Sequence, residues 1–388
     1  MAGPRPESLD LVRRLIAFDT TSRLSNLELI HFAADYLDRL GIRPVLVHDE
    51  TGKKANLWAT IGPEGPGGVV LSGHTDVVPV DGQPWDSDPF QVVERDGRLY
   101  GRGTSDMKSF IAVAMAYAAE MKQARLKEPI HFAFSYDEEV GCLGVHGLID
   151  HLKANDIRPR LGVIGEPTEM RVVDAHKGGR SYVTTVTGLE QHSSARHRGV
   201  NAIEVAAELI GFLMQVQRDY ESRRAPGAER FDPPFSTVQV GTIEGGTASN
   251  IVARCCTFRW EQRSLPGADP EEAQHRLSRY VATEVLPRMR HIHAEAEIET
   301  VLRGAVPPLV PEAGSPAEIL VKSLVGSNAT EAVSYATEAG IFQSAGVPVV
   351  VCGPGNIREA HKPNEWIELA QIAACEDFMA RLIGRLSA

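Results

Sequence analysis

Two side chains suited to metal chemistry stand at the end of a short apolar segment, residues 69–73. His74 directly follows this V-V-L-S-G segment, and Asp76 lies two positions further on. The segment predicts a buried strand, because it is short, rich in β-branched residues and followed by Gly and Pro. Alternate residues of an extended chain share a face, so both side chains would point the same way. Such a pair suits metal binding, in which one group binds the ion and the other orients it, but alone it fits a polar turn equally well.

Further acids and a second histidine follow other predicted strands, each in a loop punctuated by Gly or Pro. They are Asp106, Glu138, Glu139, Glu166 and His361. Open α/β sheets place their sites at the carboxyl ends of the strands, so these side chains are expected to share one rim. Imidazoles and carboxylates together suit zinc or a related divalent ion such as cobalt or manganese. The set offers more ligands than one catalytic zinc needs and fits two ions that share a carboxylate.

The order of predicted elements indicates two domains. Strands and helices alternate through residues 1–178, which predicts an α/β fold with a largely parallel sheet. Residues 179–304 instead follow the order strand–helix–strand–strand–helix–strand, the split βαβ arrangement. Residues 305–388 return to the first pattern, with a strand at 347–352. At 388 residues the chain exceeds what one hydrophobic core usually serves, so we expect the middle segment to be an inserted domain.

Charge and hydropathy argue against several classes of partner. The formal net charge is −11 and there is no long basic run, which disfavours nucleic acid or an anionic membrane surface. No apolar stretch reaches the roughly 18 residues of a membrane helix. The start, M-A-G-P-R-P-E-S-L-D, lacks the apolar core of a signal peptide, so we expect a cytoplasmic protein. The five cysteines are scattered, which fits reduced thiols.

Taken together, the motifs resemble one enzyme family. S-G-H-T-D-V-V-P, G-R-G-T-S-D-M-K, D-E-E-V-G, G-E-P-T and G-P-G…A-H are similar to the dinuclear zinc amidohydrolases, which include acetylornithine deacetylase, succinyl-diaminopimelate desuccinylase and aminoacylases. The segments Q-H-S-S, R-G-V-N-A-I, A-S-N-I and R-S-L-P-G extend the resemblance into the inserted region. It implies a zinc-peptidase-like catalytic domain, with a central mixed sheet flanked by helices. It also implies an inserted ferredoxin-like dimerisation or lid domain.

The resemblance also assigns roles to the acids and histidines. The implied ligands of two zinc or cobalt ions are His74 and Glu166 on one ion, Glu139 and His361 on the other, and Asp106 between them. Asp76 would orient His74, and Glu138 would be the general base. The adjacent pair makes chemical sense, because one carboxylate binds metal while its neighbour stays free for protons. A solvated acidic turn is the alternative for Glu138–Glu139 taken alone.

Further residues are implied on the substrate side. His192 would reach the active site of the partner subunit in a homodimer, with His197 as a competing histidine. Arg263 would hold the substrate α-carboxylate, because a guanidinium offers paired donors. Asn250 and the backbone around Gly353 are weaker candidates, and Glu338 is a candidate for a side-chain ammonium. Departures from the family pattern at Ser109, Glu261 and Ala195 weaken the substrate assignment and leave the metal ligands in place.

The resemblance implies a metal-dependent amidohydrolase that removes the N-acyl group of an N-acyl amino acid. The expected substrate is N2-acetyl-L-ornithine, giving L-ornithine and acetate in arginine biosynthesis. A desuccinylase, an aminoacylase and a dipeptidase on the same scaffold are the alternatives. A non-catalytic binding module would require a missing ligand or base, and every position is filled. A dinucleotide-binding dehydrogenase is set aside because no G-x-G-x-x-G follows the first strand.

Overall fold

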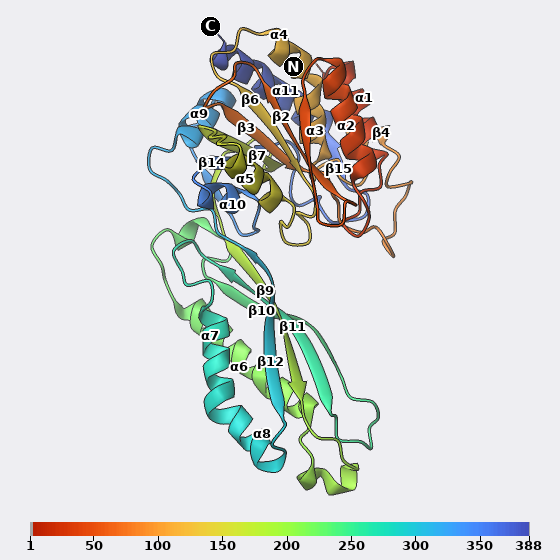
Figure 1. The fold of residues 1–388 in the computed structure, drawn as a ribbon, viewed down its shortest axis with the longest axis vertical. Coiled ribbons are helices and arrows are strands. Elements are labelled where there is room, and N and C mark those ends of the chain that lie inside the picture. The colour runs from red at the N-terminus through yellow and green to blue at the C-terminus, as the bar shows by residue number, and fades with distance from the viewer. Residues whose placement is uncertain (1–2, 388) are drawn as a thin grey trace. The chain divides into compact units, whose positions relative to one another are not determined.

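The computed structural model describes residues 3–387, which fall into two compact units. The first unit contains the chain up to Ala175, Pro311–Glu331 and the chain from Thr337 onward. The second contains His176–Val310 and Ala332–Ala336, and Figure 1 draws it from yellow-green to light blue. Catalysis by one domain, and dimerisation or closure by the other, stay predictions.

An eight-stranded sheet forms the centre of the first unit, in the order β1-β2-β6-β3-β7-β14-β8-β13. Its strands are β1 (Pro44–His48), β2 (Ala55–Ile61), β3 (Val69–His74), β6 (Ile130–Ser135), β7 (Leu161–Pro167), β8 (Val173–His176), β13 (Glu331–Val333) and β14 (Val349–Gly353). β3 pairs in parallel with β6 and β7, and β7 with β14, whereas β1, β2 and β8 add antiparallel pairs. The central parallel strands are apolar because helices cover both of their faces. The mixed sheet implied by the family resemblance is confirmed, whereas the largely parallel sheet predicted from the order of elements holds only for β6, β3, β7 and β14, because β1, β2 and β8 add antiparallel pairs.

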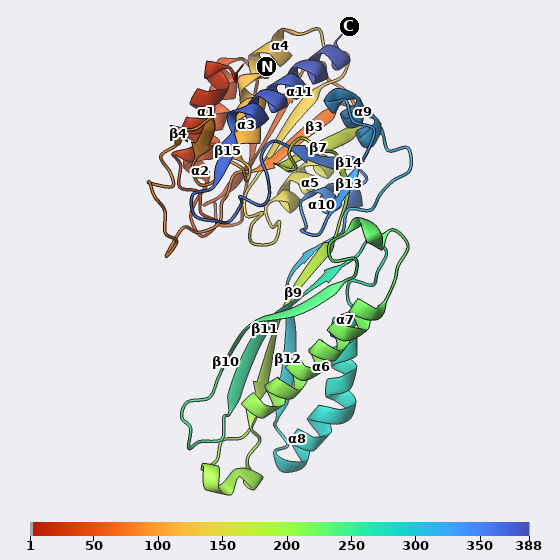
Figure 2. The same cartoon turned by 180° about the vertical axis from the view of Figure 1, so that it is seen from behind.

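Helices cover both faces of this sheet (Figures 1 and 2). They are α1 (Pro6–Ile16), α2 (Leu27–Arg39), α3 (Lys108–Ala116), α4 (Ala118–Gln123), α5 (Val145–Ala154), α9 (Pro316–Val325), α10 (Ala339–Ser344) and α11 (Leu369–Leu386). The sequence K-S-F-I-A-V-A-M-A buries α3 along its whole length, against β3, β7, α1 and α11. The two views show α11 and α5 on opposite faces. No helix within residues 3–387 is long and apolar enough to cross a membrane.

A small antiparallel sheet lies beside the main one in the first unit, in the order β15-β5-β4. Its strands are β4 (Val93–Arg95), β5 (Arg98–Tyr100) and β15 (Trp366–Glu368). β15 comes from the end of the chain and pairs with β5, so that Trp366 lies opposite Tyr100. This pairing ties the segment after His361 to the segment before Asp106.

The second unit is a four-stranded antiparallel sheet, in the order β10-β11-β9-β12, packed on helices. Its elements are β9 (Gly178–Thr187), α6 (Ala202–Ser222), β10 (Thr237–Gly245), β11 (Cys255–Ser264), α7 (Glu272–Tyr280), α8 (Leu286–Ile292) and β12 (Glu297–Val306). Alternate strand residues face the helices, and the rings of Tyr182 and Trp260 stack 4.3 Å apart in this core. The chain order and sheet order are those of a ferredoxin-like fold, as predicted.

Candidate metal centre

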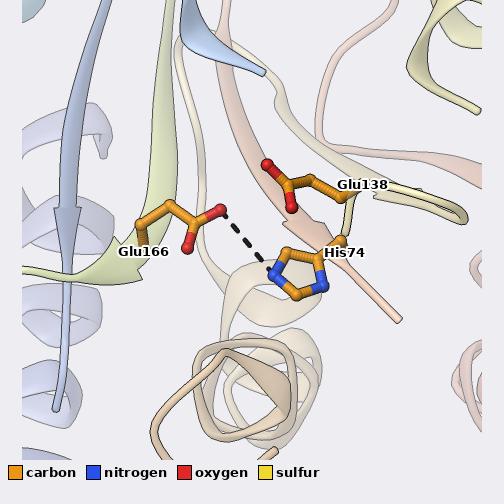
Figure 3. A group of neighbouring side chains, drawn as sticks. All are labelled: His74, Glu138 and Glu166. Atoms are coloured by element: carbon orange, nitrogen blue, oxygen red, sulfur yellow. Dashed lines mark ion pairs between the residues drawn. The ribbon is translucent and has the colours of Figure 1, made fainter. Parts of the chain in front are cut away.

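Three neighbouring strands deliver a histidine and several acids to one edge of the main sheet. His74 ends β3, Glu166 lies near the end of β7, and the pair Glu138–Glu139 follows β6 after two residues. Because β3, β6 and β7 run in parallel, their carboxyl ends lie together. Figure 3 shows the imidazole of His74 facing Glu166, with the Glu138 carboxylate beside them.

Asp106 lies between two histidines that are far apart in the sequence. Its Oδ1 is 3.0 Å from Nε2 of His74, and its Oδ2 is 3.3 Å from Nε2 of His361. Each oxygen of one carboxylate therefore faces a different imidazole. This is the arrangement that a carboxylate shared between two metal ions requires.

One further carboxylate accompanies each histidine. Glu166 Oε1 is 3.7 Å from Nε2 of His74, and Glu139 Oε2 is 3.0 Å from Nε2 of His361. The structure thus brings together all five side chains implied as ligands by the sequence. Glu138 lies with them, since its carboxylate, His74 and Glu166 offer ligand atoms within 4.8 Å of one another.

Asp76 contacts both His74 and the turn that carries the two glutamates. The backbone oxygen of Asp76 lies 2.9 Å from Nδ1 of His74, whereas its carboxylate is 3.7 Å from that nitrogen. The carboxylate instead accepts hydrogen bonds from the backbone N–H groups of Glu138 and Glu139, at 3.1 and 3.3 Å. Ser22 also donates to it, at 2.7 Å. Asp76 therefore orients His74 through its main chain and holds the Glu138–Glu139 turn through its side chain.

Burial and crowding shift the proton affinities of these groups. Burial raises the pKa of Glu138 and of Glu166 well above the usual value. Burial and the nearby Asp106 charge also raise the pKa of Glu139. Although burial favours its neutral form, hydrogen bonds to His361 and His74 hold the pKa of Asp106 well below its usual range. Hydrogen bonds to Asp106 and Glu139 raise the pKa of His361 to about 10.

These shifts describe a buried site that lacks enough positive charge of its own. Several carboxylates share a small volume of low dielectric, where an ionised carboxylate is costly unless a cation compensates it. Oxygen and imidazole nitrogen ligands in this proportion are those of zinc, cobalt and manganese sites. The residues therefore fit divalent metal ions.

The second unit carries three of the residues expected on the substrate side. His192 is exposed, and its Nδ1 lies 2.8 Å from Oγ of Ser194. Asn250 is also exposed, and its backbone oxygen accepts a hydrogen bond from the N–H of Ser193. The Arg263 side chain on β11 is 36% exposed and pairs with Glu261 at 3.1 Å. Their roles toward a substrate stay predictions.

Glu338 and Gly353 lie in the first unit. Glu338 is only 1% exposed, directly before α10, and accepts a hydrogen bond from Ser72 at 3.2 Å. Burial raises the pKa of its carboxyl to about 7. Gly353 ends β14, where a Cβ atom would lie 2.0 Å from the backbone oxygen of Gly165. Close packing of two strands therefore requires glycine there, and binding of a substrate by either residue stays a prediction.

The sequence analysis did not identify the residues that hold the ligand-bearing segments in place through hydrogen bonds. Ser22 contacts Asp76, and Glu365 contacts the segment that ends in Asp106. The sequence gives no specific signal for Glu365, which is one acid in the polar segment H-K-P-N-E-W that begins at His361. Nothing in that segment alone indicates its partner, which lies 259 residues earlier in the chain.

Comparison with known proteins gives this geometry a family. Residues 70–385 match the model of peptidase family M20/M25/M40. The chain belongs to this family. It is 34% identical over 389 aligned residues to acetylornithine deacetylase of Pasteurella multocida (strain Pm70), covering 98% of each chain. It is 35% identical to acetylornithine deacetylase of Proteus mirabilis (strain HI4320), covering 97% of this chain and 96% of the relative. As a member of this family, the protein is a metal-dependent amidohydrolase, as the sequence predicted.

Solved structures of the family share the fold at lower sequence identity. A metallo-carboxypeptidase from Sulfolobus solfataricus has a TM-score of 0.76 at 18% identity, covering 98% of this chain and 99% of the other. Aminopeptidase PepT from Bacillus cereus has a TM-score of 0.73 at 19% identity, covering 98% of both chains. These structural matches over nearly the whole chain confirm the predicted fold class.

Proposed function

We propose that the protein hydrolyses N2-acetyl-L-ornithine to L-ornithine and acetate, a step of arginine biosynthesis in the cytoplasm. The observation that carries the chemistry is the position of Asp106, each of whose oxygens faces a different imidazole. Two relatives with 34 and 35% identity over nearly the whole chain, both named acetylornithine deacetylase, support the choice of substrate.

The proposed centre holds two divalent ions, zinc in the first place and cobalt as the alternative. His74 and Glu166 would hold one ion, Glu139 and His361 would hold the other, and Asp106 would contact both. Bound there, divalent ions would supply Lewis-acid chemistry: polarisation of the amide carbonyl and a lower pKa for the attacking water. The protein's part is to keep the ligands at fixed positions: the strands β3 and β7 place His74 and Glu166, and the contacts of Asp76 hold the turn that carries Glu139.

Glu138 carries the proton in the proposed reaction. Its carboxylate accepts a proton from the attacking water and delivers it to the nitrogen of the leaving amine. The backbone N–H of Glu138 is bound to Asp76, and the Cys142 thiol donates to its Oε1 at 3.3 Å. Burial raises the pKa of this carboxyl well above its usual value, which brings it toward the pH at which a base and acid both work.

Substrate recognition is assigned to the residues that the family resemblance implies for it. Arg263 holds the α-carboxylate, and its partly exposed guanidinium supports this role. His192 stabilises the developing oxyanion in the partner subunit of a homodimer, which its exposure on the second unit supports. Asn250 and the Gly353 backbone contribute polar contacts to the substrate, and Glu338 binds the ammonium group of its ornithine side chain.

A substrate panel tests the assignment. The protein is loaded with zinc or with cobalt and assayed with N2-acetyl-L-ornithine, N-acetyl-L-methionine, N-succinyl-diaminopimelate and an unblocked dipeptide. We expect the highest kcat/KM for N2-acetyl-L-ornithine. A higher value for the succinyl compound or the dipeptide would assign the protein to another activity on the same scaffold, and no hydrolysis of any of them would refute the amidohydrolase itself.

A further inference from the structure

The segment that ends in Asp106 is held by a buried carboxylate on a distant part of the chain. Glu365 Oε1 accepts hydrogen bonds from the backbone N–H groups of Ser105 and Asp106, at 2.8 and 3.0 Å. Its Oε2 accepts a third from Gly103 at 3.0 Å. The side chain of Glu365 is 0% exposed. Three backbone N–H groups between residues 103 and 106 are thus held by one side chain.

Arg102 balances the charge of Glu365 and extends the contacts. Its Nη1 donates to Glu365 Oε2 at 2.7 Å, and both side chains are buried. Its Nη2 donates to Oε1 of Gln83 at 2.8 Å, and its guanidinium lies 5.2 Å from the Trp85 ring. The same Gln83 oxygen accepts a hydrogen bond from Nε1 of Trp85 at 3.0 Å. The amide of Gln83 is therefore oriented with its oxygen toward Arg102.

That orientation directs the other end of the Gln83 amide at His361. Its Nε2 donates to the backbone oxygen of His361 at 3.0 Å. His361 has a φ of 64° and a side chain that is 54% exposed, whereas the side chains of His74 and Asp106 are 1 and 6% exposed. The side chain of His361 is therefore the most exposed of the three. A hydrogen bond to its main chain contributes most to fixing its position, because less of the protein encloses it.

We infer that Glu365, Arg102 and Gln83, named here the Glu365 network, are positioning residues for the metal site of Asp106, Glu139 and His361. The network joins the main chain of one ligand to the main chain of another through continuous hydrogen bonds. His74 and Glu166 instead lie on paired strands of the sheet, which position them without the network. The inference rests on the proposed two-metal centre. It names the residues that fix the positions of the ligands of one of the two ions.

The sharpest variant is Gln83→Glu. A glutamate keeps an oxygen for Arg102 and Trp85 but cannot donate to the His361 carbonyl. Gln83 is partly exposed, so the substitution should leave folding intact. Groups that orient metal ligands typically contribute about 10–100-fold to metal affinity. We expect one of the two metal equivalents to bind at least about tenfold more weakly and the other to change little.

The measurement uses the full chain after its metal has been removed with a chelator. Zinc is titrated calorimetrically, and cobalt is titrated by its visible absorption, which reports the coordination of each equivalent. Glu365→Gln replaces an acceptor oxygen by a donor, so the segment that carries the shared ligand Asp106 loses a hydrogen-bond acceptor. Both metal equivalents should therefore bind more weakly. Glu128→Gln is the matched control. Its ion pair with Arg160, at 2.7 Å, lies near the start of β6, at the opposite end from the site, and both equivalents should stay unchanged.

The outcomes separate the inference from the function on which it rests. Wild-type protein that binds fewer than two equivalents would refute the two-metal centre and this inference with it. Wild-type protein that binds two equivalents, with both affinities unaltered in Gln83→Glu, would overturn the inference alone. An equal loss of both equivalents, together with a lower unfolding temperature of the metal-free protein, would show that Gln83 only stabilises the fold.

Discussion

Replacing Glu138 by glutamine tests the division of labour between the two adjacent glutamates. Glutamine keeps the size of the side chain and an oxygen that can accept from the Cys142 thiol. The hydrogen bond between Asp76 and residue 138 involves the backbone N–H, so it survives the change. The five proposed ligands therefore keep their positions, and only the ability to carry a proton is lost.

The expected loss in rate follows from that single missing function. A positioned acid–base group contributes about 10²–10⁴-fold, so kcat should fall by at least 10²-fold. This corresponds to about 2.7–5.4 kcal/mol of lost transition-state stabilisation at about 1.36 kcal/mol per factor of ten. Bound metal should stay at the wild-type level.

The same substitution should raise the free energy of unfolding of the metal-free protein at neutral pH. Burial raises the pKa of Glu138 above its usual 4.5, so the folded state holds this proton more tightly than the unfolded state does. As pH rises from about 4.5 through the folded-state pKa, ionising the group costs stability in the wild type. Glutamine avoids that cost, and the metal-free variant should be the more stable protein at neutral pH.

The assay combines kcat for N2-acetyl-L-ornithine, metal content by mass spectrometry, and urea unfolding at pH 5 and pH 8. Glu138→Gln with full metal content and a rate close to wild type would place the base elsewhere. A variant that has lost one metal equivalent would mean that Glu138 is a ligand, as its closeness to His74 and Glu166 also permits. Either result would refute the proposed roles.

Three further predictions concern the substrate side. Arg263→Ala should raise KM for N2-acetyl-L-ornithine by at least about tenfold with unchanged metal content, because a charge-assisted hydrogen bond contributes about 1.5–3 kcal/mol; an unchanged KM would leave the α-carboxylate with another partner. Mixing inactive Glu138→Ala with inactive His192→Ala should restore part of the activity, since some hybrid sites carry both intact groups; a monomer, or mixtures that stay inactive, would contradict the dimer. Glu338→Gln should impair hydrolysis of N2-acetyl-L-ornithine and spare that of N-acetyl-L-methionine; equal impairment of both would mean that this buried acid is structural.

The rim of acids and histidines was predictable because its signal is local. Most of the motifs place a polar side chain at or soon after the end of an apolar strand, and parallel strands bring such positions together without any knowledge of contacts. His74 and Glu166 follow this rule on β3 and β7. Asp76 does not follow this rule, because it lies beyond the end of β3. β3 ends at His74, so the alternation of faces does not extend to residue 76, and its carboxylate turns to the Glu138–Glu139 backbone instead.

The support of the site was not predictable from one sequence. Glu365 and Arg102 are 263 positions apart, and neither residue type indicates burial, because charged side chains are mostly exposed. Only the folded chain shows that each neutralises the other. Glu338 is a similar case, since an acid before a short helix is ordinary and its contact with Ser72 spans 266 positions.

The division of the first unit by the second has a consequence for how the centre is completed during synthesis. His74, Asp106, Glu139 and Glu166 all precede the second unit in the sequence, whereas His361 and Glu365 follow it. A nascent chain that has emerged only as far as Val310 therefore carries the ligands proposed for one ion but neither the second histidine nor the carboxylate that fixes Asp106. His361, the ligand proposed to complete the second ion's site, and Glu365, which fixes Asp106, are therefore synthesised together, after the whole second unit.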